Sequence, residues 1–351
     1  NVGDDLIIQI YDFEGTGLSD VAFCLEATNN APVPTPVTFT SSSSGASGSY
    51  RIACVDMNGD HLDDLVSISS TNVNIREQNS GGGFTTKNIT TTDANFEPTW
   101  SLAAADYNRD GYTDLLYGAG NGVTFMRSDG TGNGFTEVSG PQDVFSQRSN
   151  FVDINQDGHL DAFVCHDVAP NVYYINDGSG NLTFNQGGLG DYSSGGNYGS
   201  IWIDYDNDRD LDLFIAKCGG ETARRVNQMH TNDGSGNYTE NALDIGLADP
   251  MQTWSSAWGD FDSDGDMDVF VGASSGSHKL MRNDGGTFTD ISAGSGVDLL
   301  SQTSTETVTY DFDNDGNLDL VSGGNLLFGD GNMNFTVHTG VFPGAGAYGD
   351  V

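Results

Sequence analysis

The amino-acid sequence predicts an all-β protein, a seven-bladed β-propeller with four-stranded antiparallel blades. Three observations support this prediction. An acidic motif, D-x-[DN]-x-D-G-x-x-D between two apolar stretches, recurs seven times in the 351 residues. Successive copies are about fifty residues apart, which is a typical length for a propeller repeat. Glycine is abundant, at 48 residues, and proline is scarce, at 8, as expected for short strands joined by tight turns.

The seven acidic motifs divide the chain into blades. They begin at Asp12, Asp56, Asp106, Asp153, Asp204, Asp260 and Asp311. We therefore expect a single domain over residues 1–351, with blades that start near residues 5, 50, 99, 147, 198, 253 and 304. Residues 345–351 look like the beginning of another repeat, so they form either a closing strand or the start of a truncated eighth repeat. A parallel β-solenoid is the alternative fold, but it would have shorter repeats without the four-strand pattern.

The sixth repeat shows the four expected strands most plainly. Thr253–Gly259 reads as the first strand, and Val269–Gly272, after the acidic loop, as the second. His278–Arg282 and Thr287–Ile291 then read as a third and a fourth strand, joined by an Asn-Asp-Gly turn. Such turns supply the positive φ angles that tight hairpins need. No segment shows a convincing helical period, so no amphipathic helix is expected.

The acidic loop between the first and second strand of each blade has the donor pattern of a calcium site. Positions 1, 3, 5 and 9 carry oxygen donors, position 7 offers its carbonyl, and glycine at position 6 lets the chain reverse. Six or seven hard oxygen ligands suit Ca²⁺ better than Mg²⁺ or a soft metal. The loop is not an EF-hand, because strands rather than helices follow it and the EF-hand glutamate is missing. Turns capped by their own side chains, without metal, are the alternative.

The predicted metal ligands are the residues at positions 1, 3, 5 and 9 of the seven loops. They are Asp12, Glu14, Thr16 and Asp20; Asp56, Asn58, Asp60 and Asp64; Asp106, Asn108, Asp110 and Asp114; Asp153, Asn155, Asp157 and Asp161; Asp204, Asp206, Asp208 and Asp212; Asp260, Asp262, Asp264 and Asp268; Asp311, Asp313, Asp315 and Asp319. We expect the first loop to be the weakest site, because Thr16 replaces a carboxylate. His61 and Arg209 replace the glycine at position 6, at about 1 kcal/mol each if φ is positive there.

Two stretches carry a resemblance to a known family. They are W-I-D-Y-D-N-D-R-D-L-D-L-F at residues 202–214 and A-W-G-D-F-D-S-D-G-D-M-D-V-F at residues 257–270. Both resemble the FG-GAP/VCBS calcium-binding propeller repeats of the integrin α-subunit and of bacterial CRTAC/UnbV-type secreted proteins. The literal Phe-Gly…Gly-Ala-Pro signature is absent. The resemblance implies Ca²⁺ in the loop of each blade, ligand-binding loops on the opposite face, and a secreted or cell-surface location.

The charge balance limits the partners that we expect. There are 50 Asp+Glu against 12 Lys+Arg, and the formal net charge is −38. This balance disfavours nucleic acid and anionic membranes, which need a positive face. No apolar run approaches the ~18 residues of a membrane span, so membrane insertion is not expected. About half of the acidic residues occupy donor positions in the loops, so we interpret them as internal ligands.

A basic loop is predicted on the face opposite the metal loops. It is Lys217–Gln228, and it contains Arg224 and Arg225. Arginine suits an acidic glycan or a protein carboxylate, so both side chains are candidate ligand contacts. The alternative is a solvated loop with no ligand.

Aromatic residues recur six positions before the acidic loops. They are Tyr50, Trp100, Tyr198 and Trp254. At the start of the innermost strands they would line a central funnel, where aromatic rings stack on sugars. The alternative is packing between blades.

These features predict a secreted or cell-surface, calcium-stabilised module for adhesion to, or binding of, a protein or carbohydrate ligand. A polysaccharide lyase is one alternative, because His166, Asp167 and His278 lie just after second strands. An enzyme is less expected than a binding module, because no triad or carboxylate pair stands apart from the metal loops. A structural subunit of a surface filament or of a longer secreted protein is the other alternative, since the sequence stops where an eighth repeat would begin.

The four cysteines fit no zinc motif. We favour the disulfides Cys24–Cys54 and Cys165–Cys218, because each would join neighbouring repeats. Four buried thiols are the alternative.

Overall fold

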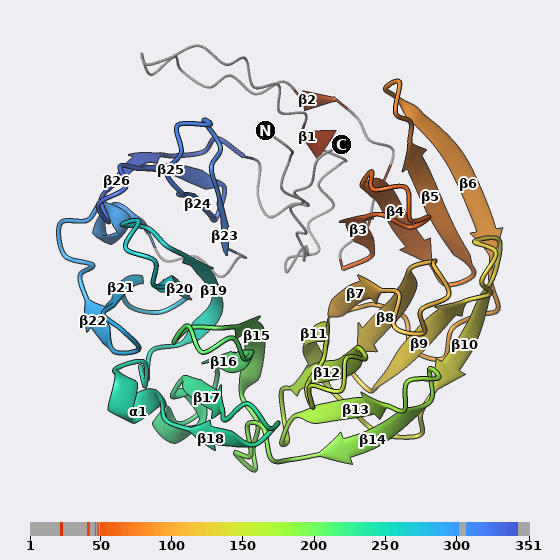
Figure 1. Cartoon of the computed structure of the whole chain (residues 1–351), viewed down its shortest axis with the longest axis horizontal. Helices are drawn as coiled ribbons and strands as arrows, with labels where there is room; N and C mark the ends of the chain where they lie inside the picture. Colours follow the sequence, from red (N-terminus) through yellow and green to blue (C-terminus); the bar gives the residue numbers. More distant parts are fainter. Residues whose placement is uncertain are drawn as a thin grey trace.

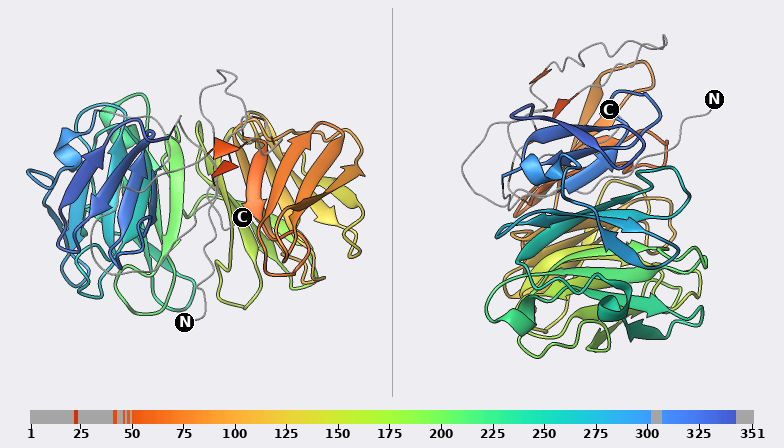
Figure 2. Two further views of the ribbon diagram at one scale, coloured as in Figure 1. Left: turned by 90° about the horizontal axis from the view of Figure 1, so that it is seen from above. Right: turned by 90° about the vertical axis from the view of Figure 1, so that its left-hand side faces the viewer.

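The computed structural model describes residues 22–23, 41–42, 46, 48, 50–301 and 307–342. These residues contain six four-stranded antiparallel sheets, each formed by four consecutive strands, and one two-stranded sheet. The six sheets stand around a common centre like blades (Figure 1). Their strands run along the short axis of the ring (Figure 2). The all-β prediction and the four-stranded blades are confirmed, and the parallel solenoid is excluded.

The strand bounds place an acidic loop at the same point of every blade. The six blades are β3 (Ile52–Val55), β4 (Asp64–Ser69), β5 (Asn72–Gln78) and β6 (Phe84–Thr90); β7 (Ser101–Ala105), β8 (Asp114–Ala119), β9 (Gly122–Ser128) and β10 (Phe135–Ser139); β11 (Ser146–Val152), β12 (Asp161–His166), β13 (Val172–Asn176) and β14 (Leu182–Gln186); β15 (Asn197–Ile203), β16 (Asp212–Lys217), β17 (Gln228–Asn232) and β18 (Tyr238–Glu240); β19 (Thr253–Gly259), β20 (Asp268–Ala273), β21 (Lys279–Asn283) and β22 (Phe288–Asp290); β23 (Thr307–Tyr310), β24 (Asp319–Ser322), β25 (Asn325–Gly329) and β26 (Phe335–His338). In each blade the loop connects the first strand to the second.

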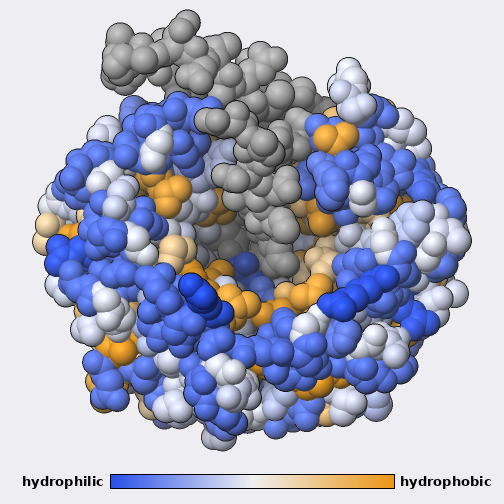
Figure 3. Space-filling view, in the orientation of Figure 1, coloured by the Kyte–Doolittle hydropathy of each residue, from blue (hydrophilic) through white to orange (hydrophobic). Residues whose placement is uncertain are grey.

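The second strand of a blade is the most buried element. Every residue of β8, β12, β16 and β20 is buried, because neighbouring blades cover both faces of the sheet there. The sequence of these strands is accordingly almost continuously apolar. The core between blades is built by pairs such as Phe214 of β16 and Trp258 of β19, whose ring centroids are 5.4 Å apart. Hydrophobic residues border the central hollow on the face shown in Figure 3.

The predicted number of seven blades is not tested, because most of the first repeat lies outside the described residues. Within that repeat, β1 (Ala22–Phe23) and β2 (Ser41–Ser42) form an antiparallel pair that lies between the first and the last four-stranded sheet (Figure 1). The predicted donors Asp12, Glu14, Thr16 and Asp20, and residues 345–351, also lie outside the described part. Among the described residues, no helix has the length and apolar character of a membrane span.

Three short helical segments lie in the connections between strands. They are η1 (Thr222–Arg225), α1 (Ala242–Ile245) and η2 (Val297–Leu299). The sequence did not predict them, because a segment of four residues or fewer is too short to display a helical period.

The predicted Cys165–Cys218 disulfide is wrong. Both cysteines are free and buried. Each thiol instead contacts a residue of β15: Cys165 contacts Ser200, and Cys218 contacts Tyr198. The pairing Cys24–Cys54 is not tested, because Cys24 lies outside the described residues.

Candidate metal centres

The loop from Asp106 to Asp114 illustrates a local geometry that five of the six described loops share in full. In the fifth loop Asp204 accepts from the N–H of Arg209 at position 6, and no bond to it from position 5 is described. The Asp106 carboxylate accepts hydrogen bonds from the backbone N–H groups of Asp110 (3.0 Å) and Gly111 (2.8 Å). Asp110 in turn accepts from the N–H of Tyr112 (3.0 Å). The side chains at positions 1 and 5 therefore satisfy the backbone of the loop, as Asx turns do. This part of the metal-free alternative is present in the structure.

The aspartate at position 9 anchors each described loop to two strands. In the sixth repeat, Oδ2 of Asp268 accepts from the N–H of Phe261 (2.9 Å), just after the first strand. Its Oδ1 accepts from the N–H of Asn283 (2.8 Å), at the end of the third strand. The same pair of bonds recurs at Asp64, Asp114, Asp161, Asp212 and Asp319. This anchoring role was not predicted, because the partner on the third strand is a backbone group.

Burial shifts the acidity of all six anchoring carboxyls. It raises the pKa of Asp64 to about 6. It raises the pKa to about 7 for Asp114, Asp212, Asp268 and Asp319, and raises that of Asp161 in the same direction. Desolvation disfavours the charged carboxylate, and a nearby cation would oppose this effect.

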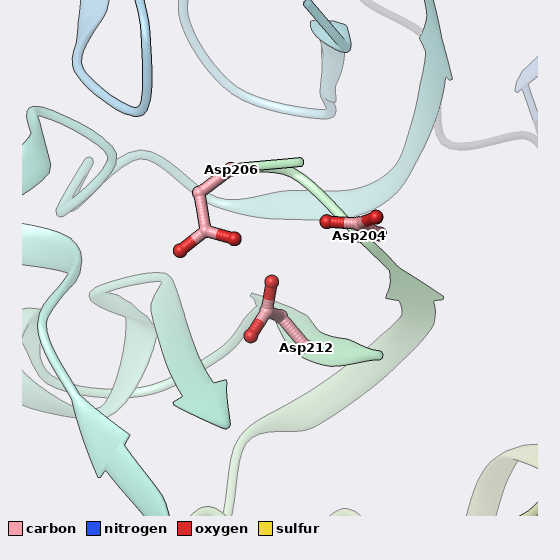
Figure 4. Close-up of side chains that lie close together, drawn as sticks. All are labelled: Asp204, Asp206 and Asp212. Carbon is pink, nitrogen blue, oxygen red and sulfur yellow. The ribbon is translucent and has the colours of Figure 1, made fainter. Parts of the chain in front are cut away.

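Three carboxylates converge in each of the last three loops. In the fifth repeat, Asp204, Asp206 and Asp212 supply oxygen atoms that lie within 4.8 Å of one another. Figure 4 shows these three side chains facing a common space. The equivalent group in the sixth loop is Asp260, Asp262 and Asp268. In the seventh loop the group is Asp311, Asp313 and Asp315, which contains the position-5 carboxylate instead of the position-9 one. Carboxylates this close repel one another unless a proton or a cation lies between them.

The pKa values of the position-3 aspartates are consistent with this crowding of carboxylates. Burial, followed by neighbouring carboxylates, raises the pKa of Asp206, Asp262 and Asp313. The remaining predicted donors Asp208 and Asp264 stand outside the groups of three, and each accepts from the N–H of the residue at position 7, at 2.9 Å.

Three oxygen atoms in these groups fit a cation. Oδ1 of Asp204, Oδ1 of Asp206 and Oδ1 of Asp262 are buried, and no described residue gives them a hydrogen bond. A buried oxygen without a partner is costly, and more so when it belongs to a carboxylate. The donors are all oxygen atoms, as Ca²⁺ prefers. The residues of the fifth and sixth loops therefore fit a hard divalent cation.

The second, third and fourth loops contain asparagine at position 3, and their geometry differs. The Asn108 amide donates to Asp110 at 3.1 Å. Equivalent bonds join Asn58 to Asp60 (3.2 Å) and Asn155 to Asp157 (3.0 Å). The amide therefore donates to one oxygen of the position-5 carboxylate. Because asparagine is neutral, these loops also have one negative charge fewer than the last three. These three loops fit a cation less well than the last three.

Every described loop has a left-handed residue at position 6, as predicted, including His61 (φ 66°) and Arg209 (φ 78°). Position 4 is left-handed as well, which the sequence did not predict, because its residue type varies. The residues there are Gly59, Arg109, Gln156, Asn207, Ser263 and Asn314.

On the face opposite the metal loops, Arg224 joins two connections. Its guanidinium pairs with Asp167 at 2.6 Å, and its Nε donates to the Ser194 carbonyl at 2.8 Å. The neighbouring Arg225 is partly buried, and its Nε has no hydrogen-bond partner among the described residues. Arg224 thus holds the loop after β12 against η1. Of the two predicted arginines, Arg225 is therefore the better candidate for contact with a ligand.

Lys217, at the start of the predicted basic loop, is internal. It is buried, and its Nζ donates to the Gly195 carbonyl (3.0 Å) and to Oδ1 of Asn197 (2.7 Å). Burial lowers its pKa to about 8. The basic character of this loop is therefore only partly exposed.

The aromatic residues at the start of the first strands contact one another across blades. The rings of Tyr198 and Trp254 are 5.2 Å apart. Trp100 lies 5.8 Å from Tyr50 and 5.5 Å from Phe145. Both tryptophans are only partly buried. Packing between blades, the alternative to ligand contact, therefore accounts for part of each ring.

A local irregularity sets the position of two of these rings. The pairing of β15 with β16 shifts register at Tyr198, and that of β19 with β20 shifts at Trp254. Such bulges redirect side chains, and they are common near functional sites.

The two histidines considered for catalysis brace loops. His278 accepts from the N–H of Ala273 (3.0 Å), and its other ring nitrogen lies 2.9 Å from the Ser301 carbonyl. His166 accepts from the N–H of Val168 at 3.3 Å. Both are buried, and burial lowers the pKa of each imidazole. This geometry gives both rings structural roles.

The FG-GAP-like repeat family matches the chain five times. The matched residues are 56–117, 106–164, 153–215, 204–271 and 260–322, so the matches together span well over half of the sequence. No curated protein sequence matches significantly.

Among solved structures, the chain is similar to BBS1N in its complex with ARL6DN. The TM-score is 0.53 at 11% identity, over 87% of this chain and 88% of that chain. A mutant of AofleA from Arthrobotrys oligospora gives a TM-score of 0.44 at 11% identity, over 83% and 87% of the two chains. At this identity the first likeness supports the fold alone.

Proposed function

The chain belongs to the FG-GAP-like repeat family, and we propose that it is a calcium-stabilised β-propeller that binds a protein or carbohydrate ligand in a secreted or cell-surface setting. The observation that supports calcium is the convergence of three carboxylates in the fifth and sixth loops, with buried oxygen atoms that have no described partner. A bound cation would supply the positive charge that these oxygen atoms lack.

The chain's own residues would use that charge to hold each blade together. Asp204 follows the first strand of its blade, and Asp212 begins the second. Asp212 also reaches the third strand through the N–H of Asn232 at 2.8 Å. A cation shared by Asp204, Asp206 and Asp212 would therefore fasten three of the four strands at one end. Its role in this proposal is structural.

The opposite face is the proposed ligand surface. The partly exposed Tyr198–Trp254 pair lies at a register shift there. Aromatic rings with an accessible face suit sugars and apolar protein side chains. The surrounding charge of the molecule is strongly negative, which favours neutral or locally basic ligands. Arg225 is the exception that would accommodate a carboxylate.

Calorimetric titration of the full chain with calcium chloride tests the metal part of this proposal. We expect binding, and we expect Asp206→Asn to weaken one site by about tenfold or more, because the variant removes a charged donor. Asp93→Asn is the matched control, since Asp93 is exposed and lies outside the loops. Equal titrations for both variants would contradict the assignment of Asp206 as a ligand.

The ligand part is tested by a glycan and protein binding screen with Trp254→Ala. We expect weaker binding for this variant with an unchanged calcium titration. Formation of unsaturated products from an acidic polysaccharide would contradict the proposal of a module that binds without turnover.

A further inference from the structure

The residue at position 4 of a metal loop bonds to the metal loop of the next blade. This contact occurs in three successive loops, and always toward position 6 or 7 of the following loop. The bonds run from Arg109 to the Gly158 carbonyl, from Gln156 to Oδ1 of Asp210 (2.7 Å), and from Asn207 to both the Gly265 carbonyl (3.2 Å) and Oδ1 of Asp266 (2.8 Å).

The backbone at these positions is left-handed. The φ angles are 59° at Arg109, 59° at Gln156 and 63° at Asn207. Glycine adopts this conformation without strain, whereas other residues pay about 1 kcal/mol or more. At Arg109, Gln156 and Asn207 the bond to the next loop offsets part of this cost.

A second contact between the same blades holds position 2 of these loops. Nδ2 of Asn176 donates to the Tyr107 carbonyl at 2.8 Å, and Nδ2 of Asn283 donates to the Tyr205 carbonyl at 2.7 Å. For the fourth loop, Tyr238 of the next blade takes this role, and its hydroxyl donates to the Ile154 carbonyl at 2.9 Å. Positions 2 and 4 flank the position-3 donor, so the next blade fixes the backbone on both sides of it.

We propose that neighbouring metal loops are energetically coupled through these position-4 side chains, so that a cation bound at one loop strengthens binding at the adjacent loop. The inference rests on the proposed calcium binding. A loop that closes on a cation fixes the acceptors at its positions 6 and 7, which lowers the entropy cost of ordering the preceding loop. Such coupling is reciprocal between the two binding free energies.

The fifth and sixth loops form the pair in which the effect is most measurable. Both contain buried carboxylate oxygens without a described partner, and Asn207 of the fifth loop makes two bonds to the sixth. The third and fourth loops are linked as well, but their position-3 residues are asparagines.

A thermodynamic cycle on the full chain tests the coupling. Asp262→Asn weakens the sixth loop, and Asn207→Gly removes the link while relieving the left-handed strain. We expect Asp262→Asn to lower the calcium affinity of the fifth loop by about threefold to tenfold in the presence of Asn207, and to leave it unchanged when residue 207 is glycine. The probe is calcium chloride, measured by calorimetry and by equilibrium dialysis.

Ser263→Gly is the matched control. Ser263 is left-handed at position 4 of the sixth loop, with φ 61°, and no inter-loop hydrogen bond is described for it. This variant should leave the effect of Asp262→Asn on the fifth loop intact. If Asn207→Gly does not fold, as judged by circular dichroism, Gln156→Gly provides the same test between the fourth and fifth loops, with Asp206→Asn as the partner.

Two outcomes are separable. Equal effects of Asp262→Asn with and without Asn207, in a protein that binds calcium, would overturn the coupling alone. Absence of any calcium binding to the unaltered chain would overturn the proposed function, and the coupling with it.

Discussion

Two side chains occupy a backbone conformation that the other loops reserve for glycine. His61 and Arg209 stand at position 6 with φ of 66° and 78°. The equivalent Gly111 is left-handed too, and a Cβ added to it would meet no heavy atom within 4 Å. The conformation itself, rather than a lack of space, is therefore what disfavours a side chain at this position.

Replacement of these two residues by glycine should stabilise the protein. We expect His61→Gly and Arg209→Gly each to raise the free energy of unfolding by about 1 kcal/mol, because strain at positive φ is relieved. Urea unfolding at saturating calcium measures this change. Gly111→Ala is the control in the reverse direction and should lower the free energy by a similar amount. No difference among the three variants would argue against strain at position 6.

The buried aspartates at position 9 predict an unusual pH dependence in the calcium-free protein. The pKa of Asp114 is about 7 in the folded state against an ordinary 3.8. Between these values the folded state retains a proton that the unfolded state releases, so the contribution of Asp114 to stability falls as pH rises from about 4 to about 7. Buried histidines with lowered pKa act in the opposite direction below their ordinary pKa.

Comparison with Asp114→Asn isolates the aspartate. We expect the stability of the unaltered chain relative to Asp114→Asn to decrease from pH 5 to pH 8 without calcium, as measured by urea unfolding. Calcium should reduce this decrease, because a cation competes with the proton for the carboxylate. A relative stability that does not change with pH would contradict the raised pKa.

The turns that join the third and fourth strands also connect neighbouring blades. Nδ2 of Asn283 donates to the Tyr205 carbonyl of the preceding blade and, at 3.2 Å, to the Met267 carbonyl of its own loop. Asn334 occupies a similar hairpin but is exposed, and it bonds only within that turn. Asn283 begins its turn at the end of the third strand, whereas Asn334 ends its turn just before the fourth strand, and only Asn283 bonds to another blade.

Alanine substitution should separate these two roles. We expect Asn283→Ala to lower the free energy of unfolding by about 1–3 kcal/mol, because it leaves buried carbonyl groups without a donor. Asn334→Ala should change it by less than about 0.5 kcal/mol. Thermal or urea unfolding measures both. Similar losses for the two variants would show that the bond between blades contributes little.

The sequence could predict what recurs along the chain but not what joins one repeat to the next. The first strand Thr253–Gly259 and the acidic loop after it were predicted with the bounds that the structure has, because apolar runs and Asp spacing are local patterns. The left-handed position 4, the bond from Asn207 to Asp266 and the Asn283 tie were not. The residue type at position 4 varies, so it gives no signal for a left-handed backbone. The two bonds join residues about sixty or more positions apart, for which a single sequence carries no signal either. The mistaken Cys165–Cys218 disulfide has the same origin, since sequence proximity of repeats does not set the direction of a side chain.

The net charge of −38 affects the stability of the whole ring of blades. Carboxylates gather at one end of the six described blades, and the fifth and sixth loops contain oxygen atoms that lack a described partner. Without cations, repulsion at that end would oppose the closed arrangement of the loops. Calcium is therefore expected to act on the stability of the propeller as a whole, whatever ligand the other face binds.

Thermal unfolding of the full chain with 1 mM calcium and after chelation tests the stabilising role of calcium directly. At a Kd of about 0.1 mM each site would add about 1.4 kcal/mol. Three sites would then raise the melting temperature by several degrees, at roughly 2 °C per kcal/mol for a chain of this size. We expect a higher melting temperature with calcium, and Asp206→Asn should reduce the rise. Superimposable melting curves with and without calcium would contradict a stabilising role of calcium in this fold.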